Sequence, residues 1–185
     1  MKTNKYLDYH IENKVAEICL KRSPINAFSI EFLKEILSSL KIFNTDNDVD
    51  AIIIRSSIPD IFCAGLDLDI LINKPILKVR EFLELLYIDL WDTQYNMKKP
   101  TIAVINGAAR GGGMTLAISC DTIIASDKAS FGYPEIDLGL LPAIHFNHLP
   151  KIVGRFLLIF ISSAEINLLF SPIFNKVSSP LYFKS

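Results

Sequence analysis

The first third of the chain changes from strand-like to helix-like spacing of its apolar residues. Residues 6–11 and 15–21 flank a short polar turn, and their weak alternation of apolar and polar positions predicts a β-hairpin. Ser29 is a good N-cap residue, and an amphipathic helix is predicted behind it over residues 30–44. Its apolar positions recur at helical spacing: Phe32, Leu33, Ile36, Leu37, Leu40 and Phe43.

After residue 50, short apolar runs alternate with segments of helical spacing. Residues 51–55, 101–105 and 122–126 are short runs rich in β-branched residues, which predicts buried strands. Residues 75–97 keep a helical period until Lys98 to Pro100 end it, and residues 114–119 suit a shorter helix. The resulting order repeats strand-to-helix crossovers, so the sequence predicts an α/β fold.

Two glycine-containing turns each follow a short apolar segment that resembles a strand. Gly111, Gly112 and Gly113 lie where the strand region after Pro100 gives way to a helix, and Gly65 lies in a similar turn. Free backbone N–H groups and the positive end of a helix dipole meet at such a place. A tight turn, a phosphate loop and an oxyanion site all compete as explanations. The phosphate loop fits poorly because neither G-x-x-x-x-G-K-[ST] nor G-x-G-x-x-G is present.

Composition limits the function without choosing one. The 185 residues suffice for one domain, half of them are apolar, and the formal net charge is −1. This charge gives no reason to expect nucleic acid or an anionic membrane as a partner. Cys19, Cys63 and Cys120 lack paired spacing, so neither disulfides nor a zinc cluster is expected. The first ten residues have no apolar signal segment, and we expect a cytoplasmic protein.

Four stretches in one order resemble the enoyl-CoA hydratase/isomerase, or crotonase, family. They are residues 22–27, 62–68, 106–121 and 131–142, and the similarity extends over about residues 15–155. The resemblance implies the crotonase-like spiral of repeated β-β-α units, assembled as homo-trimers or hexamers. It also implies an acyl-CoA thioester as substrate, with coenzyme A as part of that substrate and no other cofactor.

The resemblance also implies which residues form the site. Family members hold an enolate oxygen with two backbone N–H groups, and the matching donors here are Leu66 and Gly112. Glu135 matches a family glutamate that follows the Phe-Gly-x-Pro turn. Burial beside Phe131 and Tyr133 is expected to raise its pKa. The positions matching the substrate-binding part of the family site are Arg22, Ile25, Ala27, Ala64, Gly65, Gly111, Thr115 and Pro134.

The carboxylates decide the expected chemistry. Family hydratases use two glutamates to activate one water, but here the first of these positions is Thr115 and only Glu135 remains. One base suffices to move a proton between two carbons, so the resemblance favours conversion of a 3-enoyl-CoA to a 2-enoyl-CoA. A slow hydratase, another crotonase reaction and an inactive acyl-CoA-binding relative remain alternatives. Asp67 and Asp121 are expected to be structural, and Asp137 is a weaker candidate for a second acid.

The resemblance weakens toward the C-terminal end of the sequence. The usual glycine-rich segment after Pro142 is replaced by Ala143-Ile144-His145, and the similarity stops near Arg155. His145 and His148 have the spacing of a metal pair, yet without further ligands a core or surface role is favoured. We therefore expect a core domain over residues 1–155 and a divergent apolar tail over 156–185, as in a truncated relative. The tail is too short and too polar to predict a membrane span.

Overall fold

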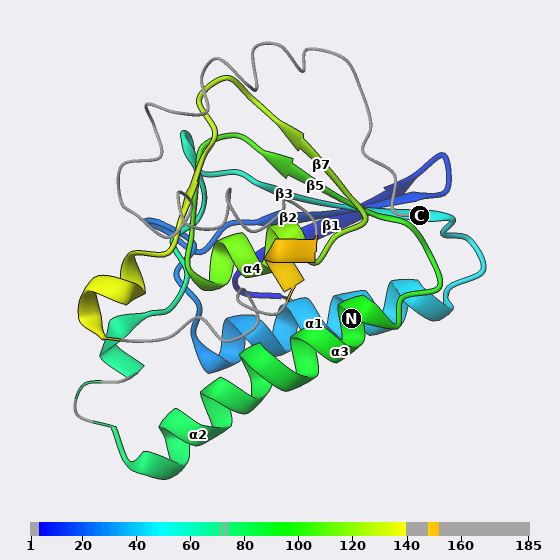
Figure 1. The fold of residues 1–185 in the computed structure, drawn as a ribbon. Helices are drawn as coiled ribbons and strands as arrows, with labels where there is room; N and C mark the ends of the chain where they lie inside the picture. Colours follow the sequence, from blue (N-terminus) through cyan, green and yellow to red (C-terminus); the bar gives the residue numbers. More distant parts are fainter. Residues whose placement is uncertain (1–3, 71, 73, 140–147, 152–185) are drawn as a thin grey trace.

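The protein was analysed as a computed structural model, which describes residues 4–70, 72, 74–139 and 148–151. Its larger sheet has five strands in the order β1-β2-β3-β5-β7 (Figure 1). The β1-β2 hairpin is antiparallel, and the other neighbours are parallel. The strands are β1 (Leu7–Glu12), β2 (Val15–Leu20), β3 (Ala51–Ser56), β5 (Thr101–Ile105) and β7 (Thr122–Ala125). The predicted hairpin and the three predicted strands are confirmed.

A second, smaller sheet was missed by the sequence analysis. It has three parallel strands in the order β4-β6-β8: β4 (Ile61–Cys63), β6 (Ala108–Arg110) and β8 (Ser130–Gly132). Each strand has only three residues, which is too short to show an alternating pattern. The segments predicted as turns or loops are therefore partly strands, and this sheet carries the residues that form the site.

Helix α1 and the longer helical stretch over residues 76–95 lie on the same side of the larger sheet (Figure 1). Helix α1 (Ile30–Thr45) begins at Ser29, whose hydroxyl accepts the N–H of Phe32 at 3.2 Å, as predicted. Its apolar face is buried in one core with alternate residues of β3, Ile52 and Ile54. Burial of this face stabilises both elements together.

The predicted helix over residues 75–97 is a single stretch in three parts. It comprises α2 (Ile76–Glu84), a π-helical segment η2 (Leu85–Leu90) and α3 (Trp91–Tyr95). The wider π turn was not predicted, because its side-chain spacing over one turn resembles that of an α-helix. Such π turns are rare and frequently occur at functional sites.

Two shorter helical elements complete the described fold. Helix α4 (Gly112–Ile118) follows β6 and is buried at every residue, which agrees with the helix predicted over residues 114–119. A 3₁₀-helix, η3 (Pro134–Leu138), follows β8. A one-turn η1 (Leu68–Ile70) follows the Gly65 turn. These elements start where strands of the smaller sheet end.

Candidate active site

The two glycine turns singled out in the sequence are in contact. Gly65 follows β4 and Gly111 follows β6, and these strands are parallel neighbours, so both turns lie at the same edge of the smaller sheet. A Cβ atom added to Gly65 would lie 2.6 Å from the carbonyl oxygen of Arg110 and 3.0 Å from the nitrogen of Gly112. Gly65 also has a φ of +86°, which disfavours any side chain. Glycine is therefore needed for this close approach.

The turns present two backbone N–H groups. The Phe28 N–H donates to the Gly65 carbonyl at 2.6 Å, and the Asp67 N–H donates to the Phe28 carbonyl at 3.1 Å, which fixes the turn around Leu66. Within the described part of the chain, no hydrogen bond uses the N–H of Leu66 or that of Gly112. Two fixed N–H donors close together can hold a developing oxyanion.

The remaining glycines of the triplet fit a close-packed turn. A Cβ on Gly113 would lie 2.3 Å from the Cys63 carbonyl oxygen, so helix α4 packs directly on β4. A Cβ on Gly112 would lie 3.1 Å from the ring of Phe28 and 3.3 Å from Leu86. The tight-turn and the oxyanion explanations of the triplet are therefore compatible, because the same packing that excludes side chains orients the N–H groups.

Glu135 is brought to this turn by η3. The Gly111 N–H donates to the Gly132 carbonyl at 2.9 Å, which joins the end of β8 to the glycine triplet. A Cβ on Gly111 would lie 2.9 and 3.0 Å from the two carboxylate oxygens of Glu135. Burial raises the pKa of Glu135, and a hydrogen bond to its own backbone opposes this shift. The predicted direction of its pKa shift is confirmed.

Two tyrosines respond to the charge of Glu135, and Thr115 interacts with one of them. Thr115 and Tyr133 are each 4 % exposed, and the Thr115 hydroxyl donates to the Gly111 carbonyl at 3.3 Å. Burial raises the pKa of Tyr133 well above its ordinary value, an interaction with Thr115 lowers it, and the charge of Glu135 raises it. The half-buried Tyr87 has its pKa raised by burial and then by Glu135. Nothing in the sequence singled out Tyr87, because its helical position alone carries no chemical signal.

Residues expected to line the substrate groove lie beside the Leu66 turn. The Arg22 guanidinium donates to the Ala27 carbonyl and to the Asp67 carboxylate, both at 2.6 Å. The Ala64 N–H donates to the Ile25 carbonyl at 3.0 Å. Loop 22–27 and the turn after β4 are therefore one connected unit. The structure thus gives Asp67 the structural contact expected of it.

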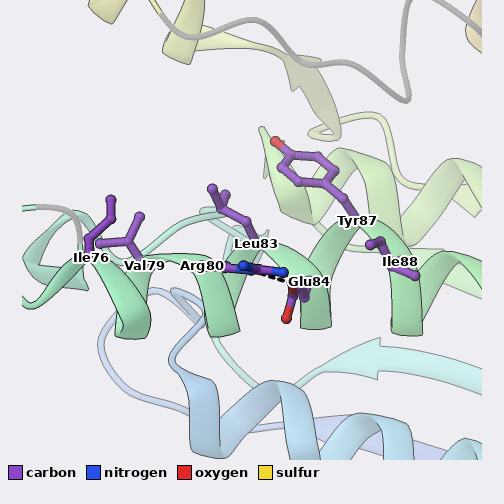
Figure 2. Close-up of a pocket in the computed structure, with 7 residues that line it drawn as sticks. All are labelled: Ile76, Val79, Arg80, Leu83, Glu84, Tyr87 and Ile88. Carbon is purple, nitrogen blue, oxygen red and sulfur yellow. Dashed lines mark hydrogen bonds and ion pairs between the residues drawn. The ribbon is translucent and has the colours of Figure 1, made fainter.

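An open apolar groove of about 320 Å³ lies on the surface of the helix that carries Tyr87 (Figure 2). Figure 2 shows Tyr87 extending from the same side of this helix as Val79 and Leu83. The residues that line it are Ile76, Val79, Arg80, Leu83, Glu84, Tyr87 and Ile88. The sequence analysis did not predict this groove.

The other residues singled out in the sequence are exposed, make contacts that support the fold, or lie outside the described residues. Asp121 accepts hydrogen bonds from the Thr101 N–H and hydroxyl at 2.9 and 2.8 Å, as expected of a structural residue. Pro134 and Asp137 are exposed on η3. The ring of His148 packs edge-on against Trp91 with centroids 4.7 Å apart. His145 and the predicted tail over residues 156–185 lie outside the described residues.

The described residues contain neither a cluster of metal ligands nor a membrane-spanning helix. No group of three or more His, Cys, Asp or Glu side chains there is arranged to hold a metal ion. No helix in that part of the chain is long and apolar enough to cross a membrane.

The fold and the sequence both place the chain among known proteins. The sequence pattern of the enoyl-CoA hydratase/isomerase family matches residues 10–158, and the chain belongs to that family. Enoyl-CoA hydratase from Bacillus anthracis superposes with a TM-score of 0.78 at 26 % identity, over 85 % of this chain and 62 % of that one. DspI from Pseudomonas aeruginosa superposes with a TM-score of 0.81 at 26 % identity, over 88 % and 66 %. The predicted crotonase-like fold is confirmed.

Curated relatives extend beyond the region of similarity. Crotonyl-CoA hydratase from Syntrophomonas wolfei is 37 % identical over 145 residues, which cover 77 % of this chain and 55 % of the relative. Mitochondrial enoyl-CoA hydratase from Pongo abelii is 37 % identical over 145 residues, which cover 77 % and 49 %. The chain therefore spans about half the length of the curated relatives it matches.

Proposed function

We propose that the protein acts on acyl-CoA thioesters, shifting the double bond of a 3-enoyl-CoA to give a 2-enoyl-CoA. The observation that carries this proposal is the position of one carboxylate, Glu135, beside two adjoining turns whose Leu66 and Gly112 N–H groups have no hydrogen bond within the described residues. Thr115 occupies the other glutamate position of family hydratases. A reaction that needs only one base fits this arrangement.

Glu135 is the base in the proposed reaction. Its carboxylate removes a proton from C2 of the substrate, and the electron pair spreads over the conjugated system onto the thioester oxygen. The double bond then lies between C2 and C3 after Glu135 returns the proton to C4, so no atom is gained or lost. Positioned bases of this kind contribute about 10²- to 10⁴-fold in rate.

The N–H groups of Leu66 and Gly112 stabilise the intermediate. Both would donate to the thioester oxygen, where negative charge develops when C2 loses its proton. Removing one such donor typically costs about 3 kcal/mol of transition-state stabilisation. The connected unit of loop 22–27 and the Gly65 turn supports this role, because it fixes the Leu66 backbone from both sides.

Hydration of a 2-enoyl-CoA is the second candidate. It is favoured by the similarity to relatives that include a crotonyl-CoA hydratase and an enoyl-CoA hydratase. In this reaction Glu135 alone would activate a water, since the Thr115 hydroxyl is a poor proton acceptor at neutral pH. The proposal is therefore that hydration is slower than isomerisation in this chain.

Turnover of a 3-enoyl-CoA and a 2-enoyl-CoA by the purified 185-residue chain tests both candidates, with Glu135→Gln measured beside it. Conversion of the 3-enoyl substrate that is lost in Glu135→Gln supports isomerisation. Conversion of the 2-enoyl substrate alone supports hydration instead. A folded sample that converts neither would reject both activities for this chain.

A further inference from the structure

The peptide group between Gly111 and Gly112 carries one of the two N–H groups of the candidate site. Its nitrogen lies 3.0 Å from the position of a Cβ on Gly65, so it faces the turn that contains Leu66. In a planar trans peptide the carbonyl and the N–H point in opposite directions. Whatever holds the Gly111 carbonyl therefore also sets the direction of the Gly112 N–H.

Thr115 holds this carbonyl with two hydrogen bonds. Its backbone N–H donates to the Gly111 carbonyl oxygen at 3.0 Å, and its hydroxyl donates to the same oxygen at 3.3 Å. Thr115 is 4 % exposed, so both bonds lie away from bulk water. Two donors from one residue restrict the direction of the carbonyl more than the backbone bond alone.

This peptide needs a second contact because it joins two glycines. Glycine has no Cβ to restrict φ and ψ, so a peptide between two glycines rotates with little steric hindrance. The backbone bond from the Thr115 N–H is also the first of helix α4, and helix ends fray. The Thr115 hydroxyl adds a bond that keeps the Gly111 carbonyl directed into the helix and the Gly112 N–H directed out of it.

We propose that Thr115 is a positioning residue for an oxyanion donor: its hydroxyl holds the Gly111 carbonyl, so that the Gly112 N–H stays directed at the thioester oxygen. This rests on the proposed function, in which the N–H groups of Leu66 and Gly112 stabilise negative charge on that oxygen. The role requires no proton transfer by the Thr115 hydroxyl. It therefore gives Thr115 a use in a position where family hydratases have a glutamate.

Thr115→Val tests the proposal, because it removes the hydroxyl and keeps the shape of the side chain, whereas Thr115→Ser keeps the hydroxyl. Ser119→Ala is the matched control: the buried Ser119 hydroxyl makes the same kind of bond one turn further along α4, to the Thr115 carbonyl at 2.7 Å. We expect Thr115→Val to lower kcat about 3- to 10-fold, the value of one neutral hydrogen bond, with KM nearly unchanged because the loss falls on the transition state. Thr115→Ser and Ser119→Ala should keep the wild-type kcat. An unchanged kcat in Thr115→Val, or an equal loss in either of the other two variants, would overturn the proposal.

The infrared band of a bound thioester carbonyl gives a second readout that needs no turnover. Hydrogen bonds to a carbonyl oxygen polarise the C=O bond and move its stretching band to lower frequency. The ligand is the unreactive thioester butyryl-CoA, labelled with ¹³C at the thioester carbonyl and added to saturation. We expect the shift seen in wild type to be smaller in Thr115→Val and to be retained in Ser119→Ala and Thr115→Ser.

This measurement separates the role of Thr115 from the proposed function. A full shift in Thr115→Val would reject the role of Thr115 and leave the proposed function intact. A smaller shift in Thr115→Val, in a chain that converts no enoyl-CoA, would support the role and reject the proposed reaction. A wild-type chain that shows no shift would reject the two N–H groups as donors, and the role of Thr115 with them.

Discussion

The carboxylate of Glu135 lies against the α-carbon of Gly111. A Cβ at Gly111 would come within 2.9 Å of one carboxylate oxygen and 3.0 Å of the other. Gly111 also has φ 51° and ψ −121°, a backbone conformation that residues with a Cβ rarely adopt. One glycine therefore serves two purposes, because it turns the chain into α4 and leaves space for the Glu135 carboxylate.

Replacing Gly111 by alanine should lower both stability and activity. The backbone strain costs of order 1–3 kcal/mol, and the new methyl group displaces the Glu135 carboxylate from the turn. Gly139→Ala is the control, because Gly139 has φ +74° and a Cβ there meets nothing within 4 Å. We expect both variants to lower the midpoint of thermal unfolding, but only Gly111→Ala to lower kcat at least tenfold at a temperature where both are folded. Equal kcat values in the two variants would show that the Gly111 contact is irrelevant to catalysis.

The Arg22–Asp67 contact should matter for stability and for substrate binding. Each residue is about one-fifth exposed, with side-chain exposures of 21 % and 22 %, and Arg22 also donates to the Ala27 carbonyl. A charge-assisted hydrogen bond of this kind contributes about 1.5–3 kcal/mol. Urea unfolding of Arg22→Ala, Asp67→Ala and the double variant should give a coupling energy of at least about 0.5 kcal/mol. The single variants should also raise KM, because the Leu66 turn loses its anchor.

An exposed ion pair provides the comparison for that cycle. Lys14 and Asp50 approach to 3.5 Å with exposures of 63 % and 68 %, so water screens their interaction. The same double-mutant cycle on this pair should give a coupling energy near zero. A coupling of similar size in both cycles would contradict a special role for Arg22 and Asp67.

Restoring the second carboxylate should favour hydration. In Thr115→Glu, a carboxylate on α4 would join Glu135 in holding and activating one water. We expect hydration of a 2-enoyl-CoA to rise about 100-fold, the lower end of what a positioned base contributes. Thr115→Gln is the matched control because it has nearly the same shape without the charge. If the two variants hydrate the substrate equally well, the position of Thr115 is not what limits hydration.

The buried carboxyl group of Glu135 should make stability depend on pH. Burial raises its pKa in the folded chain, so the folded state holds the proton more tightly than the unfolded state. This contribution is fully present below the ordinary glutamate pKa of about 4.3 and is lost as pH rises through the folded pKa. Glu135→Gln should therefore be more stable than wild type at neutral pH, and the difference should vanish in acid.

Thermal unfolding over a series of pH values measures that difference. Glu12→Gln is a suitable control, because Glu12 is exposed at the end of β1. The difference between Glu135→Gln and wild type should grow with pH, whereas the control should show no such trend. A Glu135→Gln variant that is less stable than wild type at neutral pH would mean that contacts of the ionised carboxylate outweigh its burial.

The sequence predicted the longer elements well because their burial is periodic. Helix α1 was predicted over residues 30–44 and ends at Thr45, and β5 matches its predicted range of residues 101–105. Ser29 caps α1 as its side chain suggested. In each case one face of an element is buried along its whole length, and this leaves a repeated signal in the sequence.

The site was predicted in part, and for different reasons. The glycine triplet and Glu135 come close together, as the family motifs implied. The glycines could be recognised in the sequence because no other residue fits a turn as crowded as this one. The smaller sheet was missed because three-residue strands carry no period. Tyr87 was missed because its electrostatic interaction with Glu135 depends on how the helix that carries it packs in the fold, and such a long-range interaction leaves no local pattern.

The smaller sheet also determines when the site can exist during synthesis of the chain. In its parallel pairings Ile61 lies beside Ala108, and Ala108 lies beside Ser130. Strands β4 and β6 can therefore pair only after a strand much later in the sequence has been synthesised. Such distant pairings slow folding, because the intervening chain must be closed first. A nascent chain that ends after α4 contains Leu66 and Gly112 but not yet Glu135. The N–H groups of Leu66 and Gly112 are therefore synthesised before the Glu135 carboxylate that completes the candidate site.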